Sequence, residues 1–256
     1  MRPSTSPANA NRFQRAAPVG PLFFGRSGIL ARHRYTGPVV DFREPGAARA
    51  GGYALALASV LVAVGLALHP LPSRGLFEQA SVLASTPLWG PIHIAIAMGF
   101  VLCVLGGLLM LAAGGMLIRH WLNAFAWGAI AVGMIFFTGV ALINGFVMHA
   151  LAPIASAGDA VVYDAFNRLL VGFGWLGNPL FLAGLTTLAF MEVRLHTIGM
   201  SRELAWFGLA VAMLSWLRGI GSATGLYFLE PFVLANIPAF LWLGWYGVRV
   251  AMLARR

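Results

Sequence analysis

The sequence predicts an all-α fold: a polytopic membrane helix bundle of six transmembrane helices, with the N-terminus and the C-terminus both in the cytoplasm. Hydrophobic residues make up 59% of the 256 residues and charged residues only 10%, whereas about a quarter of a soluble domain is charged. Six apolar runs also reach or approach the ~20 residues that a helix needs to cross the hydrocarbon core. The placement of arginine between these runs predicts the orientation.

The six apolar runs are almost free of charged residues. Their limits are 52–69, 91–118, 121–151, 169–191, 204–221 and 228–253. A surface helix of a soluble protein shows a polar face opposite its apolar face, and these runs lack one. They are therefore predicted to face lipid.

The chain carries 17 basic residues, all of them arginine, and a net charge of +9. The arginines gather in the N-terminal tail and in alternate connections, for example at Arg119 and Arg194. Connections rich in arginine stay in the cytoplasm, which accounts for the positive charge without nucleic acid. The lipid bilayer is the predicted partner, and other membrane subunits stay open as partners.

The sequence divides into two parts. Residues 1–50 hold eight arginines among recurrent proline and glycine and little apolar surface, so they are predicted to be a disordered basic cytoplasmic tail. Residues 51–256 are the predicted six-helix transmembrane domain. Inside it, the 70–90 connection contains GLFEQASVLAS, which is expected to form a short helix on the membrane surface.

Five ionisable residues are predicted to share a layer at the outer membrane boundary: His69, His93, His149, Arg218 and Glu230. Two imidazoles on neighbouring helices can hold haem, and three can hold copper or zinc. A histidine beside arginine and glutamate can also bind a quinone head group. The competing interpretation is that these histidines simply meet water and head groups, because the inner side holds as many of them (His33, His120 and His196). The cofactor and any metal therefore stay open.

The connections predict which of these residues meet. A tight turn joins the runs at 91–118 and 121–151, so His93 and His149 are expected to face the same outer cavity. The long 70–90 connection leaves the first helix, with His69, free to lie elsewhere. Asn144 precedes His149 by five residues, or about 500° of a regular α-helix, so the two side chains are expected to point ~140° apart.

Small residues predict helix contacts. Gly99, Cys103 and Gly107 follow one another at four-residue spacing, which lets helices approach closely. Cys103 is thus interpreted as a contact residue, because a thiol in apolar surroundings is inert.

Two Asn-Pro features lie in apolar runs, at Asn178-Pro179 and at Asn236 before Pro238. Broken helices line substrate sites in transporters, although proline also kinks ordinary helices. The sequence shows no GxSxG, P-loop, HExxH or Rossmann motif, so no catalytic residue is assigned.

The pair His69-Pro70, then LASTPLWGPIH at 83–93, then a helix rich in glycine and leucine resemble a pattern in the DUF4386-like integral membrane proteins of bacteria. The resemblance implies a multi-pass protein of the bacterial inner (plasma) membrane. It implies no activity, and no functional residue is carried over from it.

Three functions are compatible with these residues. The first is a non-enzymatic accessory or helper subunit of a membrane complex. The second is a redox membrane subunit that binds haem, copper or quinone at the outer layer of histidine, arginine and glutamate described above. The third is a small-solute transporter that uses kinked Asn-Pro helices.

Overall fold

A computed structural model describes residues 41–69, 75–224 and 226–255. Every regular element in these ranges is helical, which confirms the all-α prediction. In chain order they are α1 (Pro45–Leu68), α2 (Leu76–Ser85), α3 (Trp89–Ala113), η1 (Gly115–Leu117), α4 (Trp121–Leu142), η2 (Ile143–Met148), α5 (His149–Ser156), α6 (Val161–Leu195), α7 (Arg202–Thr224), η3 (Tyr227–Ala235) and α8 (Asn236–Leu253). Here η1 and η3 are 3₁₀-helices and η2 is a π-helix.

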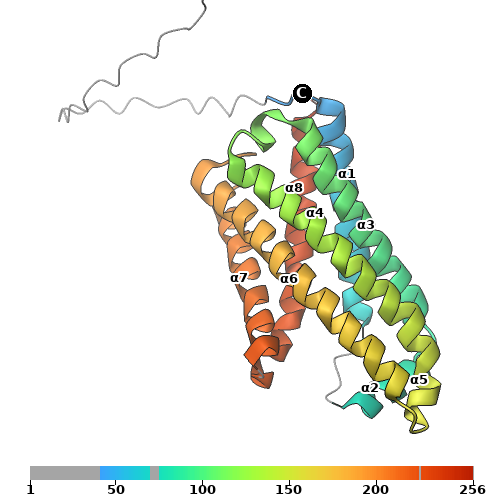
Figure 1. The fold of residues 1–256 in the computed structure, drawn as a ribbon. Coiled ribbons are helices and arrows are strands. Elements are labelled where there is room, and N and C mark those ends of the chain that lie inside the picture. The colour runs from blue at the N-terminus through green and yellow to red at the C-terminus, as the bar shows by residue number, and fades with distance from the viewer. Residues whose placement is uncertain (1–40, 70–74, 225, 256) are drawn as a thin grey trace, which may run out of the picture. The chain divides into compact units, whose positions relative to one another are not determined.

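Six helical stretches are long and apolar enough to cross a membrane, as predicted. They are Pro45–Leu68, Trp89–Ala113, Trp121–Ser156, Val161–Leu195, Arg202–Gly221 and Pro231–Leu253. They alternate in direction, so α1 begins at the end of the bundle where α8 finishes (Figure 1). We call this end, with Arg43, Arg119 and Arg194, the arginine end, and the opposite end, with His69, His93 and His149, the histidine end. Placement of the arginine end in the cytoplasm stays a prediction.

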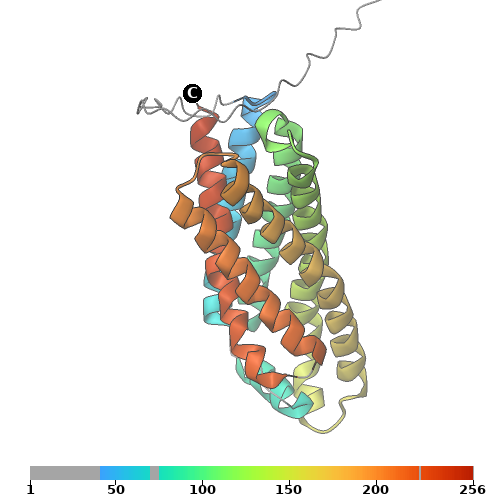
Figure 2. The same cartoon turned by 90° about the vertical axis from the view of Figure 1, so that its left-hand side faces the viewer.

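The aromatic core of the bundle forms around α8. Helix α1 packs against α3 and α8, α4 against α3 and α6, and α7 against α6 and α8; Figure 2 shows α1 and α8 side by side. The Phe240 ring of α8 stacks on Phe181 of α6, with centroids 5.0 Å apart, and meets Phe100 of α3 at 6.0 Å. Tyr246 meets Trp127 of α4 edge-on at 5.6 Å. Helix α8 therefore connects both sides of the bundle.

Small residues set the helix spacing, but the stripe of Gly99, Cys103 and Gly107 packs against two different helices. A Cβ atom added at Gly99 would lie 3.0 Å from the Ala58 oxygen of α1, whereas one at Gly107 would lie 3.2 Å from the Trp127 oxygen of α4. Cys103 between them is fully buried. Four-residue steps drift around a 3.6-residue helix, so the stripe turns from one partner to the next.

Helix α1 begins earlier than the run at 52 suggested. Pro45 occupies its first turn, where a missing backbone N–H costs no hydrogen bond, and Ala48 is already buried. The expected division at residue 50 therefore falls inside a helix. The part of the predicted disordered tail at 1–40 lies outside the described residues.

The histidine end holds a second apolar core. The short helix predicted in the 70–90 connection is present as α2, and it packs against α5. Its core consists of Ala80, Leu83, Trp89, Met148, Ala152, Ala155 and Tyr163. Helix α6 starts at Val161, ahead of the expected 169, and Asp164 and Arg168 pair one turn apart near its start, with Nε donating to Oδ2 at 2.8 Å. These elements surround the predicted histidines.

Candidate functional site

Two of the predicted site residues, His69 and His93, are in ring contact at the histidine end. His69 directly follows α1, and its ring centroid lies 5.1 Å from that of His93 in α3. The Trp89 ring meets both, at 4.7 Å from His69 and 4.6 Å from His93. The expectation that the long connection would leave His69 elsewhere is wrong, because glycines hold α1 along α3 over most of its length. We call His69, Trp89, His93 and His149 the imidazole cluster.

The hydrogen bonds of two imidazoles define which ring nitrogen is open. His93 is only 4% exposed, and its Nδ1 lies 2.9 Å from the Trp89 carbonyl oxygen. The Nδ1 of His149 lies 3.2 Å from the Leu83 carbonyl oxygen at the end of α2. A carbonyl only accepts, so both Nδ1 atoms donate, and in a neutral ring the Nε2 atom then keeps a lone pair. Ligand-binding histidines are often oriented in this way.

A π-helical turn brings His149 toward His93. A Cβ atom at Gly145 of η2 would overlap the Cβ of His93, so α3 and η2 touch at this point. His149 follows one turn later, and its hydrogen bond to the Leu83 carbonyl oxygen places it beside the second apolar core, which also contains Trp89.

The same turn changes the relation between Asn144 and His149. A π-helix bonds residue i to i+5, so a five-residue step is close to one turn. The expected separation of ~140° assumed regular α-helix, which η2 does not have. The Oδ1 of Asn144 is buried and has no hydrogen-bond partner among the residues that the structure describes. Such turns frequently occur at functional sites.

Arg218 and Glu230 lie in the fifth and sixth apolar runs. Arg218 is half-buried on α7, and Glu230 lies in η3, which packs against α7 and α8. The imidazole cluster is built at the ends of α1, α3 and α5. That all five residues share one layer stays a prediction.

The cluster fits the proposed cofactors unequally. Within the described ranges, which include all three histidines of the cluster, no group of three His, Cys, Asp or Glu side chains is placed to hold a metal. A haem would have to lie between two imidazoles, but the contact of His93 with Gly145 closes the space between α3 and η2. A quinone head group needs hydrogen-bonding groups and no metal-ligand geometry, and His93 and His149 carry ring nitrogens, although the Trp89 and His93 side chains are only 3% and 4% exposed.

The Asn-Pro features differ from each other. Pro179 lies inside α6, as expected. Asn236 instead marks the change from 3₁₀ to α winding, and Pro238 falls in the first turn of α8, where its missing N–H is tolerated. This removes one of the two kinked helices on which the transporter interpretation rested.

The hairpin of α5 and α6 projects past the bundle. The 35 residues of α6 span ~52 Å at 1.5 Å each, against ~30 Å of hydrocarbon. The ion pair of Asp164 and Arg168 is exposed, with 80% of the Arg168 side chain accessible, and exposed charges are costly in hydrocarbon. This part of α6 therefore lies outside it. Ile154, Val161 and Val162, which we call the hairpin tip, are more than half exposed there.

A buried glutamate at the arginine end was missed from the sequence. Glu192 is fully buried, and its carboxylate oxygens accept the N–H groups of Ile198 at 3.0 Å and Met200 at 2.8 Å. It holds the α6–α7 turn, in which His196 has a positive φ of 48°. The signal was a lone carboxylate at the end of an apolar run.

Comparison of the chain with protein-family models, with curated proteins and with solved structures gives no match. Function is therefore inferred from the geometry of the described residues. The resemblance to DUF4386-like proteins stays a prediction.

Proposed function

We propose that this chain is a non-enzymatic accessory or helper subunit of a membrane complex in the inner membrane of a bacterium, and that the hairpin tip contacts its partner. The supporting observation is the exposure of Ile154, Val161 and Val162 beside an exposed ion pair. Lipid tails cover apolar side chains inside the hydrocarbon, but they do not cover a segment that carries Asp164 and Arg168. Apolar groups exposed in this way are typical of a surface that another protein covers.

Cross-linking in native membranes tests the contact. A photoreactive residue at Val162 should give one discrete product with another membrane protein. The control is Leu57, which is equally exposed but lies in the middle of the α1 span, and which should label lipid only. If Val162 also labels lipid only, or if the product is a second copy of this chain, the proposal is wrong.

A substitution at the tip tests its energetic role. Val162→Asp should lower the native mass of the complex in mild detergent, because a carboxylate opposes burial at an apolar contact. Its melting temperature should match that of the wild type, because the side chain is exposed within this chain. Val162→Thr, which keeps the shape, should retain more of the complex. An unchanged native mass in Val162→Asp contradicts the proposal.

A redox subunit that binds quinone is the second candidate, and the ring contacts among His69, Trp89 and His93 at the membrane boundary favour it. The Nε2 lone pairs of His93 and His149 would accept hydrogen bonds from the hydroxyl groups of the reduced head group. The cluster lies at the membrane boundary, which a lipid-soluble quinone reaches from the bilayer.

Extraction of bound quinone separates this candidate from the first. Protein purified in mild detergent should release quinone in proportion to its amount, and His93→Phe should release much less. His120→Phe, at the arginine end, is the control for quinone carried along with lipid. Equal release from both variants contradicts quinone binding. An absorption spectrum with a haem band would contradict the conclusion that no space for haem remains between α3 and η2.

A further inference from the structure

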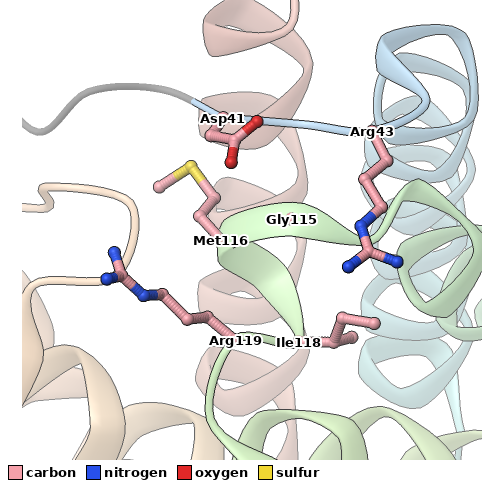
Figure 3. A pocket seen from close by; sticks show the side chains of 6 residues that line it. All are labelled: Asp41, Arg43, Gly115, Met116, Ile118 and Arg119. Carbon is pink, nitrogen blue, oxygen red and sulfur yellow. The ribbon is translucent and has the colours of Figure 1, made fainter. Parts of the chain in front are cut away.

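A hollow of about 500 Å³ lies at the arginine end, the opposite end of the bundle from the imidazole cluster. It is lined by Asp41, Arg43, Gly115, Met116, Ile118 and Arg119. Figure 3 shows Arg43 on one side and Arg119 on the other, with Asp41 and Met116 between them. The charged side chains are exposed and Met116 and Ile118 are half-buried, so the hollow has a charged rim and an apolar floor.

Backbone hydrogen bonds hold the walls of this hollow in place. The Met116 N–H donates to the Asp41 carbonyl oxygen at 2.8 Å, and the Arg43 and Glu44 N–H groups both donate to the Ala113 carbonyl oxygen, at 3.0 and 3.1 Å. Gly115 has a φ of +58°, and a Cβ atom there would overlap the Asp41 carbonyl. The segment before α1 is thus fastened to the turn between α3 and α4, and the hollow exists before any ligand arrives.

The charges of the hollow suit an anion. Among the residues that the structure describes, neither the Arg43 nor the Arg119 guanidinium has an ion pair or hydrogen-bond partner. Together with Asp41 they leave one net positive charge. Arginine matches the geometry of phosphate oxygens, and the Asp41 carboxylate can accept a hydrogen bond from a hydroxyl group.

The position of the hollow at the membrane boundary favours a lipid as the source of the anion. It lies where α3 ends and α4 begins, at the boundary of two spans. Trp121, the first residue of α4, is 70% exposed, and tryptophan gathers at the level of lipid head groups. Basic pockets at this level bind lipid head groups. We propose that the hollow binds the head group of an anionic phospholipid, with its phosphate between Arg43 and Arg119 and a head-group hydroxyl donating to Asp41.

Native mass spectrometry of the purified full chain, titrated with phosphatidylglycerol, tests this binding. Each neutralised arginine near a membrane surface weakens attraction by about fivefold, so Arg43→Gln and Arg119→Gln should each weaken phosphatidylglycerol binding about fivefold. Arg194→Gln removes the same charge from the same end outside the hollow, and it should bind like the wild type. An equal loss in all three variants overturns the proposal in favour of net charge alone.

Further titrations with other ligands, and with one further variant, define which chemical groups the hollow recognises. Phosphatidylcholine, which is neutral and carries no head-group donor, should bind far less than phosphatidylglycerol and be insensitive to Arg43→Gln. Inorganic phosphate should not displace the lipid at equal concentration, because it cannot use the apolar floor; displacement would overturn the lipid assignment and leave a phosphate site. Asp41→Ala should weaken phosphatidylglycerol relative to phosphatidic acid, which has no hydroxyl group. An unchanged ratio overturns the role of Asp41.

Discussion

The indole N–H of Trp89 donates a hydrogen bond of 3.0 Å to the carbonyl oxygen of Asn144, 55 residues further along the chain. Trp89 opens α3, and Asn144 lies in the π-helical turn η2. The bond joins the second and third spans beside His93, where π winding interrupts the α-helical hydrogen-bond pattern. The imidazole cluster is therefore held by a contact that neither span makes alone.

Loss of this bond should loosen the histidine end. Trp89→Phe keeps an aromatic ring but removes the donor, so the free energy of unfolding in detergent should fall by about 0.6–2 kcal/mol, the range for polar contacts between membrane helices. Trp121→Phe, at a largely exposed tryptophan, should change it little. Equal stability of the two variants would show that the Asn144 carbonyl finds another partner.

The close approach of α3 and α4 should depend on Gly107. Gly107→Leu places a side chain where a Cβ atom alone already meets the Trp127 oxygen at 3.2 Å and the Ala131 Cβ at 3.4 Å. Overpacking of this kind should lower stability by about 1–3 kcal/mol. Gly128→Leu on the neighbouring helix is the matched control, because nothing lies within 4 Å of a Cβ atom there. Thermal unfolding of the two variants checks the difference, and a neutral Gly107→Leu would contradict this packing.

The turn between α6 and α7 should depend on the charge of Glu192. In Glu192→Gln one of the two accepting oxygens becomes a donor group, so the N–H of Ile198 or Met200 loses its acceptor. A buried donor without a partner costs about 1–3 kcal/mol. The loss should appear in chemical unfolding and as faster amide exchange at these two residues. Glu203→Gln, at an exposed glutamate in the next helix, should show neither effect. Unchanged stability and amide exchange in Glu192→Gln would show that the two hydrogen bonds of Glu192 do not hold the turn.

The orientation of the bundle should follow its arginines. The described arginines of the arginine end are Arg43, Arg49, Arg119, Arg194, Arg202, Arg249 and Arg255, whereas those of the histidine end are Arg168 and Arg218. Positive charge stays in the cytoplasm, so the exposed Ser156 should lie outside and the exposed Ser201 inside. In a chain without Cys103, Ser156→Cys should react with an impermeant thiol reagent on intact cells and Ser201→Cys should not. The reverse pattern would invert the predicted topology.

The arrangement of the site could be predicted only in part. A short turn between the second and third spans brought His93 and His149 into consideration together. The π turn could not be foreseen, because its energetics depend on the contact of Gly145 with His93, which no local pattern encodes. The position of His69 was misjudged for a related reason: the length of a connection limits where a helix can go, but the packing of Gly99 and Gly106 against α1 decides where it does go.

The sequence by itself determined the all-α membrane fold and its six spans, because hydrophobic length and the demand that every backbone group be hydrogen-bonded in lipid leave few alternatives. The four-residue spacing of Asp164 and Arg168 also permitted their ion pair, since residues four apart are neighbours on any helix. Only the tertiary structure decided that His69 meets His93 and that Glu192 closes a turn. Those relations join residues far apart in the chain, and side-chain shape at helix contacts, rather than hydrophobicity, selects among them.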